Sequence, residues 1–239
     1  MYFTTQGVIK QEKTLYLYVK YDIISRVENG DNMNKRFITF EGGEGTGKTT
    51  LIEKLMVDLK DAGFDAIKTR EPGGSKISEQ IRNVILNVEN TEMEYMTEAL
   101  LYAASRCQHL EEVIKPALNA GKVVICDRYI DSSLAYQGVA RDLGIDKVYK
   151  INDYAISGFY PDLTIYIDVD PEIGLARIKQ NHRDMDRLDL EKIAFHNKVR
   201  SGYLEVAKMF PDRIKVIDGN DTIDNIYKKI KEIVFDSIK

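Results

Sequence analysis

The stretch Gly42-Gly43-Glu44-Gly45-Thr46-Gly47-Lys48-Thr49 decides the fold of this 239-residue chain. It matches G-x-x-x-x-G-K-[ST], follows an apolar run directly and leads into a helical pattern with leucines at every fourth position. In this context the loop turns its backbone N–H groups toward phosphate oxygens, and the helix adds the positive end of its dipole. We therefore predict that these eight residues bind a nucleoside triphosphate, with Lys48 on the β- and γ-phosphates and Thr49 on Mg²⁺. The alternative is an ordinary glycine-rich turn.

Short apolar runs alternate with helical patterns along the rest of the chain. The runs that favour buried strands lie at 37–41, 66–70, 123–127, 163–168 and 214–217. Thr91 and Glu94 have the spacing of a capping box before one of the helices. The alternation predicts an α/β fold of the P-loop NTPase type: a doubly wound, parallel, five-stranded sheet flanked by helices, with a short mobile lid.

The composition is that of an ordinary globular protein, with 44% hydrophobic and 30% charged residues. No run approaches the length of a membrane span, and a net charge of −4 argues against general binding of nucleic acid. Cys107 and Cys126 are not spaced as a metal site, and no signal peptide is apparent. These features favour a cytoplasmic enzyme without a membrane or nucleic-acid partner, which must gather positive charge locally to handle phosphates.

The first segment, residues 1–33, differs from the remainder. It is rich in tyrosine and ends in a polar loop at 28–32, directly before Met33. Residues 15–19 have the composition of a strand, but no partner for it is visible. We expect an N-terminal extension, either disordered or upstream of a natural start at Met33, followed by a catalytic domain at 34–239. A genuine tail or edge strand is the alternative.

Arginines stand where two of the apolar runs end. Arg70 closes the second run, where ligands of parallel sheets bind, although a surface arginine beside a Pro-Gly turn is an equal alternative. Asp127 closes the third run, where an acidic residue is the usual partner of a P-loop for Mg²⁺, and Arg128 can clamp a phosphate. The alternative here is a helix N-terminus capped by Asp131 or Ser132, and both readings can hold together.

A basic stretch follows the fourth apolar run. Its residues Lys179, Arg183 and Arg187 are spaced by four, so they share one face if the stretch is helical. A solvated charged helix is the alternative. The variable positions of the P-loop hold Glu44 and Thr46, so the loop supplies no arginine, and a mobile arginine segment can neutralise the moving phosphoryl group instead. Three arginine sources around one P-loop indicate two phosphorylated substrates.

From residue 35 onward the chain resembles the thymidylate kinases. The motifs that carry the resemblance are the P-loop preceded by Glu41, Arg70-Glu71-Pro72-Gly73-Gly74, Leu101-Tyr102-Ala103-Ala104-Ser105-Arg106 with Gln108-His109, and Asp127-Arg128-Tyr129 with Ser132-Ser133-Leu134-Ala135-Tyr136-Gln137-Gly138. The resemblance implies a nucleoside monophosphate kinase that uses ATP and Mg²⁺ to convert dTMP to dTDP in dTTP synthesis, and it implies a homodimer.

The resemblance also assigns the dTMP site. For the base it implies stacking on Tyr102, a hydrogen bond from Arg106 to a thymine carbonyl, and nearby Ser133 and Gln137. For the remainder of the nucleotide it implies Tyr136 beside the sugar, Glu44 at the 3′-OH, and two arginines on the phosphate, Arg70 and Arg128. The implied catalytic residues are Lys48, Arg128 and the lid residue Arg183. The role of Ser105, where the family frequently has an acid, stays open.

Three other functions remain alternatives. A kinase for uridylate or for deoxynucleotides in general would share the chemistry and differ only in the base pocket. A P-loop ATPase that acts as a switch would hydrolyse ATP slowly without an acceptor, and the excess of arginines speaks against it. A non-catalytic nucleotide-binding module is disfavoured by the intact Lys48, Thr49 and Asp127.

Overall fold

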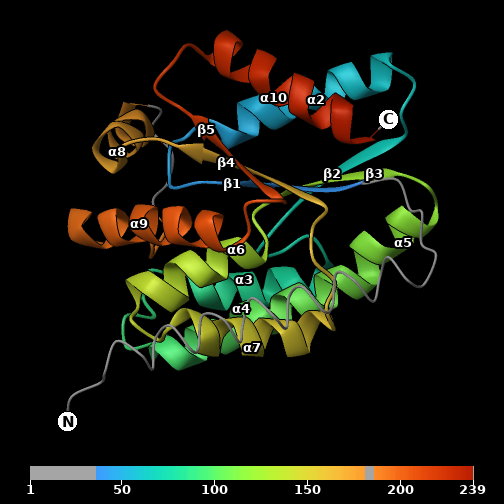
Figure 1. The fold of residues 1–239 in the computed structure, drawn as a ribbon. Helices are drawn as coiled ribbons and strands as arrows, with labels where there is room; N and C mark the ends of the chain where they lie inside the picture. Colours follow the sequence, from blue (N-terminus) through green and yellow to red (C-terminus); the bar gives the residue numbers. More distant parts are fainter. Residues whose placement is uncertain (1–35, 181–185, 239) are drawn as a thin grey trace, which may run out of the picture. The chain divides into compact units, whose positions relative to one another are not determined.

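The computed structural model describes residues 36–180 and 186–238, which belong to the unit Lys35–Lys239. Five parallel strands form one sheet in the order β2-β3-β1-β4-β5 (Figure 1). The strands are β1 (Phe37–Glu41), β2 (Ala66–Arg70), β3 (Val123–Asp127), β4 (Leu163–Asp168) and β5 (Ile214–Asp218). The five expected strands and the predicted parallel sheet flanked by helices are confirmed, whereas the lid predicted around Arg183 falls outside the described residues and stays a prediction. The segment 1–33 lies outside the described residues, so its assignment stays a prediction.

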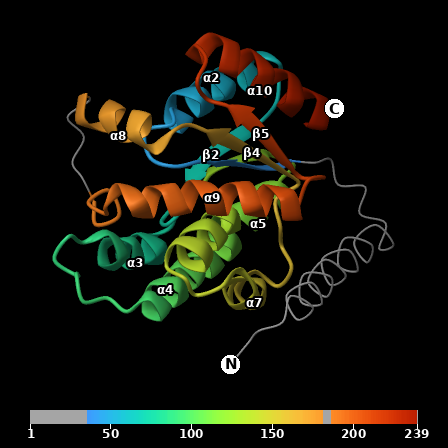
Figure 2. The same ribbon diagram turned by 60° about the vertical axis from the view of Figure 1, so that its left-hand side comes forward.

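Helices cover both faces of the sheet (Figures 1 and 2). On one face lie α2 (Lys48–Asp61) and α10 (Ile223–Ile238), and on the other lie α4 (Tyr95–His109), α7 (Ile145–Ile156) and α9 (Ile193–Met209). The remaining elements are α3 (Lys76–Leu86), η1 (Leu110–Ile114), α5 (Lys115–Asn119), α6 (Ile130–Ser133), η2 (Leu134–Ala140) and α8 (Pro171–Gln180). Among the helices of the described residues, none combines the length and the hydrophobicity that a membrane span requires.

The leucines that follow the P-loop explain how α2 is held on the sheet. Leu51, Leu55 and Leu59 recur at helical spacing and are fully buried, against Ile230 and Val234 of α10 among others. Burying one such side chain stabilises the fold by about 1.5–3 kcal/mol. The first turn of α2, which carries Lys48, is therefore fixed relative to the end of β1.

Burial differs between the central and the edge strands. The expectation that each strand is buried on both faces is right for β1, β3 and β4, but it is wrong for the edge strands. No residue of β2 is fully buried, and β5 buries only Ile214 and Ile217. An edge strand has a neighbour on one side only, so its last residue, Arg70, remains accessible at the carboxyl edge of the sheet.

The start of α4 also differs from expectation. The helix begins at Tyr95 with Glu94 at the N-cap, and no side chain caps it. Thr91 lies in a turn before the helix, so the predicted capping box is wrong. The buried residues of α4, which include Glu98, Tyr102 and Arg106, show that packing of this face rather than a local cap fixes the helix.

Candidate active site

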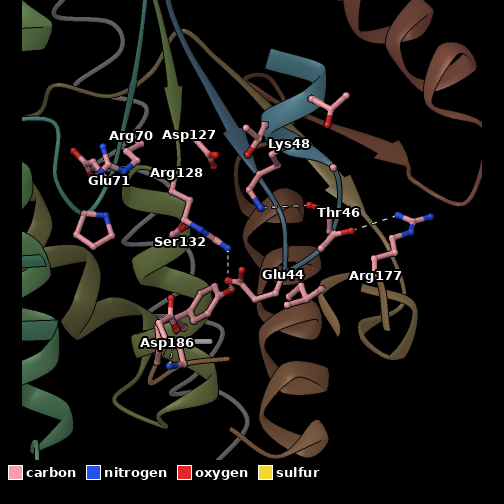
Figure 3. A pocket seen from close by; sticks show the side chains of 18 of the residues that line it. Glu44, Thr46, Lys48, Arg70, Glu71, Asp127, Arg128, Ser132, Arg177 and Asp186 are labelled. Carbon is pink, nitrogen blue, oxygen red and sulfur yellow. Dashed lines mark hydrogen bonds and ion pairs between the residues drawn. The ribbon is translucent and has the colours of Figure 1, made fainter. Parts of the chain in front are cut away.

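A cavity of about 620 Å³ opens at the carboxyl ends of the strands. It gathers most of the residues that the sequence singled out, and the close-up in Figure 3 shows several of them pointing into one space. The predicted residues that line it are Glu44, Gly45, Thr46, Gly47, Lys48, Thr49, Arg70, Tyr102, Asp127, Arg128, Tyr136 and Gln137. Gly42, Gly43, Arg106 and Ser133 are not lining residues, and Arg183 lies outside the described residues.

The P-loop curls around its own lysine. Lys48 Nζ donates to the carbonyl oxygens of Gly42 at 3.1 Å and Gly43 at 2.9 Å. Burial, with help from the charge of Arg128, lowers the pKa of Lys48. Gly45 has φ +68°, and a Cβ there would lie 2.0 Å from the carbonyl oxygen of Gly174 in α8. The loop therefore needs glycine at this position because α8 packs directly against its backbone.

Arg128 connects the P-loop with the side of the cavity assigned to the acceptor. Its backbone has φ +71°, a conformation that costs about 1–3 kcal/mol for a residue with a side chain. Its guanidinium donates to Gly42 O at 2.9 Å and to Glu44 Oε1 at 2.5 Å (Figure 3), and it lies 5.2 Å from the ring centroid of Tyr136. Glu44 also accepts from the Tyr136 hydroxyl at 3.1 Å. The predicted sugar and phosphate ligands thus form one hydrogen-bonded group.

Glu41 holds the turn that presents Arg128, a role that the sequence analysis did not assign. The carboxyl is fully buried and accepts from Tyr129 N at 2.8 Å, Ser132 Oγ at 2.5 Å and Tyr203 OH at 2.9 Å. Burial, together with the nearby charge of Asp131, raises the pKa of Glu41 to about 7. The signals in the sequence were a charged residue at the end of a buried strand and its place directly before the P-loop.

Arg106 is buried and is not among the residues that line the cavity. It is 1% exposed, and it donates from Nε to Glu71 at 2.7 Å, from Nη1 to Ser133 Oγ at 3.0 Å and to Asn152 Oδ1, and from Nη2 to Tyr129 O at 2.9 Å. A guanidinium has five N–H groups. One N–H of Nη2 is therefore not used by these bonds.

Buried polar side chains support the Arg70–Gly74 turn from below. Glu71 is bound between Arg106 and His109, whose Nδ1 lies 3.0 Å from Glu71 Oε1. Ser105 Oγ accepts from Gly73 N at 3.3 Å, which supplies the role that the sequence left open. Arg70 itself is half exposed and pairs with Glu79 at 2.9 Å. The turn is thus held from beneath while its arginine reaches the cavity.

Lys179 and Arg187 of the basic stretch lie in different local structures, a helix and a turn. Helix α8 is described to Gln180 and Arg187 lies in a turn, so the condition for a shared helical face is not met at Arg187, and Arg183 lies outside the described residues. Arg187 turns away from the cavity and donates to Ile85 O at 2.9 Å and Glu98 Oε2 at 2.5 Å. Instead Arg177, which was not singled out, lines the cavity and donates to Gly45 O at 3.4 Å (Figure 3).

Asp127 and Thr49 fit the chemistry of a magnesium site. Within residues 36–180 and 186–238, Asp127 Oδ1 is buried without a hydrogen-bond partner, and a buried carboxylate oxygen of this kind suits a cation or its water. Thr49 lines the same cavity. The described residues contain no cluster of three or more His, Cys, Asp or Glu that could hold a metal. Mg²⁺ commonly keeps waters and binds through one or two protein ligands plus phosphates, so the sparse set suits it.

A phosphate-binding loop, the arginines Arg70 and Arg128, and an aromatic wall line one cavity. This combination defines the class of protein: a P-loop kinase that acts on a nucleotide. Comparison with known proteins agrees with this class. The profile of the thymidylate kinase family matches residues 40–230.

Individual relatives agree along nearly their whole length. A thymidylate kinase of Geobacillus sp. (strain WCH70) is 56% identical over 208 residues, which are 87% of this chain and 99% of that protein. One of Clostridium novyi (strain NT) is 56% identical and covers 83% of this chain and 98% of that protein. The crystal structure of thymidylate kinase from Ehrlichia chaffeensis superposes with a TM-score of 0.68 at 33% identity, covering 83% of this chain and 97% of that one. The chain belongs to the thymidylate kinase family.

Proposed function

We propose that this chain transfers the γ-phosphoryl group of ATP to dTMP and releases dTDP and ADP. The observation that carries the proposal is the continuity of the cavity: the P-loop, the arginines Arg70 and Arg128, and the wall formed by Tyr102 and Gln137 line the same space. A nucleotide triphosphate and a nucleotide monophosphate can therefore bind with their phosphates facing each other. The family membership supports the choice of thymidylate as acceptor.

The chemistry is an in-line displacement. A phosphate oxygen of dTMP forms a bond to the γ-phosphorus of ATP while the bond from that phosphorus to the bridging oxygen breaks, and ADP leaves with the electron pair. The second pKa of a phosphate monoester is about 6, so the acceptor is mostly a dianion at neutral pH and needs no general base. The protein contributes position and neutralising charge.

The positive groups divide between the two substrates. Lys48 serves the phosphates of ATP, and Arg70 and Arg128 serve the phosphate of dTMP. Arg177 lies beside the P-loop and adds charge from α8. Arg183 remains our proposal for the lid arginine, so Arg177 and Arg183 are the two candidates for that role. Together these cations offset the repulsion between two anions brought into contact.

Thr49 and Asp127 would hold Mg²⁺, which supplies charge neutralisation on the β- and γ-phosphates when it is bound. The buried Oδ1 atom of Asp127 supports this proposal, because an unpaired carboxylate oxygen is costly in the absence of a cation or its water.

At the other end of the cavity we assign the base. Tyr102, which is 9% exposed, offers an aromatic face, and Gln137 offers its amide. The remaining N–H of Arg106 Nη2 is the donor for a thymine carbonyl. Ser133 acts by holding the Arg106 guanidinium, to which its hydroxyl is bonded.

We also propose that the active form is a homodimer. Apolar side chains on α3 and α4 are exposed, among them Ile77, Val84, Tyr95 and Leu100. These two helices pack against each other and carry much of the acceptor site, so covering their outer surface would stabilise it. Light scattering coupled to size exclusion should give twice the mass of the chain; the mass of one chain would contradict this.

The reaction is tested by following it with ³¹P NMR in the presence of ATP, Mg²⁺ and dTMP. We expect the resonances of dTDP and ADP to rise together in equal amounts. Appearance of inorganic phosphate in place of dTDP would mean that the protein is an ATPase, and the assignment of Arg70 and Arg128 to an acceptor would then be wrong.

A further inference from the structure

Glu98 of α4 is a fully buried carboxylate outside the phosphate chemistry described above. Gln137 Nε2 donates to its Oε1 at 2.9 Å. Arg141 donates to both of its oxygens, at 3.4 and 3.3 Å, and Arg187 Nη2 donates to Oε2 at 2.5 Å. A carboxylate offers about four acceptor positions, so these bonds saturate it and fix its place.

The hydrogen bond that Gln137 donates to Glu98 determines the orientation of the Gln137 amide. A carboxylate can only accept, so Gln137 must turn its NH₂ group toward Glu98. The amide is planar, and its carbonyl oxygen therefore lies on the opposite arm. Gln137 lines the cavity together with Tyr102 and Tyr136. Among the described residues, the Gln137 side chain makes one hydrogen bond, the one from Nε2 to Glu98.

We propose that Glu98 is a positioning residue for base selection: it compels Gln137 to present a hydrogen-bond acceptor to the base. Thymine carries an N–H at position 3 and can donate to this oxygen. Cytosine has an acceptor at the same position, so its lone pair faces the lone pairs of Gln137. The inference rests on the proposed function, because it requires the base to lie against Gln137.

The two arginines do not depend on Glu98 alone. Arg141 also pairs with Glu191 at 2.6 Å and stacks 4.4 Å from the ring centroid of Phe195. Arg187 also donates to Ile85 O. In Glu98→Gln both guanidiniums keep these partners. The single oxygen of the introduced amide is held by the two guanidinium donors at the Oε2 position, so its NH₂ group faces Gln137 and cannot accept from the Gln137 amide. The amide can then rotate by half a turn at little cost in shape.

The test is the pair of dissociation constants for dTMP and dCMP, measured by calorimetry without ATP on the full chain and two variants. For Glu98→Gln the preference for dTMP over dCMP should fall at least about tenfold, with dTMP bound more weakly and dCMP more tightly. Part of the preference for dTMP should remain, because Arg106 still donates to the thymine carbonyl. The matched control Arg187→Met takes a charged partner from the same carboxylate without touching Gln137, and its preference should stay within about twofold.

A folded Glu98→Gln protein with the preference of the wild type would overturn the proposal, as would an equal loss in Arg187→Met. Failure of the wild-type chain to bind dTMP would instead refute the proposed function.

A second measurement uses the wild-type chain, so it tests the proposal even if Glu98→Gln does not fold. In ¹H–¹⁵N spectra of the wild-type chain, the Gln137 side-chain amide is identified by its absence in Gln137→Met. The proposal requires these protons to exchange with water at least about tenfold more slowly than exposed glutamine amides, with and without dTMP. Rapid exchange in the free protein, or release of the amide when dTMP binds, would contradict it.

Discussion

The two ends of the cavity are built in different ways. At the phosphate end, eight consecutive residues form the P-loop, and positive φ angles at Gly42, Gly45 and Gly47 shape its backbone. At the base end, side chains from separate elements must meet: Arg106 contacts Glu71 in the turn after β2 and Asn152 in α7, which lie 35 and 46 residues away in the chain. The first end is specified by local sequence, whereas the second depends on buried pairing between distant residues. Substitutions at the phosphate end should therefore lower mainly the rate, and substitutions at the base end should lower mainly the stability.

The largest expected effect is at the base end and concerns stability. Arg106→Ala leaves Glu71 buried and without its guanidinium partner, so the free energy of unfolding should fall by about 3–5 kcal/mol. Arg70→Ala is the matched control, because that arginine is half exposed and its pair with Glu79 is solvated. It should change stability by less than about 0.5 kcal/mol while raising KM for dTMP. Urea unfolding measures both; equal losses in the two variants would contradict the comparison.

At the phosphate end the largest effect should be on rate. Lys48→Ala removes the cation of the P-loop, and we expect kcat to fall by about 10²- to 10³-fold or more. The Lys48 amine donates to backbone carbonyls and its burial is unfavourable to its charge, so the midpoint of thermal unfolding should change little. Steady-state kinetics beside a thermal melt separate the two quantities. A Lys48→Ala protein with a much lower melting midpoint and unchanged turnover would contradict the contrast between the two ends.

Protonation of Glu41 should make the stability of the protein depend on pH. Its pKa is raised to about 7 in the folded protein, above the ordinary value of 4.5. Between these values the folded state keeps a proton that the unfolded chain releases, so stability falls as the pH rises and the loss is complete above about pH 7. The shift corresponds to about 3 kcal/mol.

Urea unfolding of the wild type and of Glu41→Gln at pH 5 and pH 8 measures this contribution. The wild type should lose more stability than the variant, because the amide does not titrate. Parallel losses in the two proteins would show that Glu41 is ionised throughout the range.

The smallest effect concerns the packing of α8 on the loop. In Gly45→Ala the new Cβ meets the backbone of Gly174, and φ is +68°, so we expect a loss of about 2 kcal/mol in stability without nucleotide. Gly43→Ala is the control in the same loop, since a Cβ there meets nothing within 4 Å. A thermal melt of both variants gives the difference; equal melting midpoints would mean that α8 does not rest on Gly45.

The same contrast explains what the sequence could predict. Apolar runs located the strands, and the glycine pattern located the loop, because both signals are local. The orientation of Arg187 toward Glu98 and the burial of Arg106 behind Ser133 were not predictable, since they depend on side chains that meet only after the helices pack. Thr91 shows the same limit on a smaller scale: its spacing suited a cap, yet packing of α4 placed the helix start at Tyr95.

In the proposed function, a single cavity joins a triphosphate site to a thymine-selective acceptor site. An ADP-release assay with ATP and Mg²⁺ tests it most directly when run against dTMP, dUMP, UMP, CMP, AMP and GMP and against a blank without acceptor. We predict strong turnover with dTMP, weaker turnover with dUMP and almost none with the others or the blank. Turnover in the blank equal to that with dTMP would contradict the proposed acceptor site.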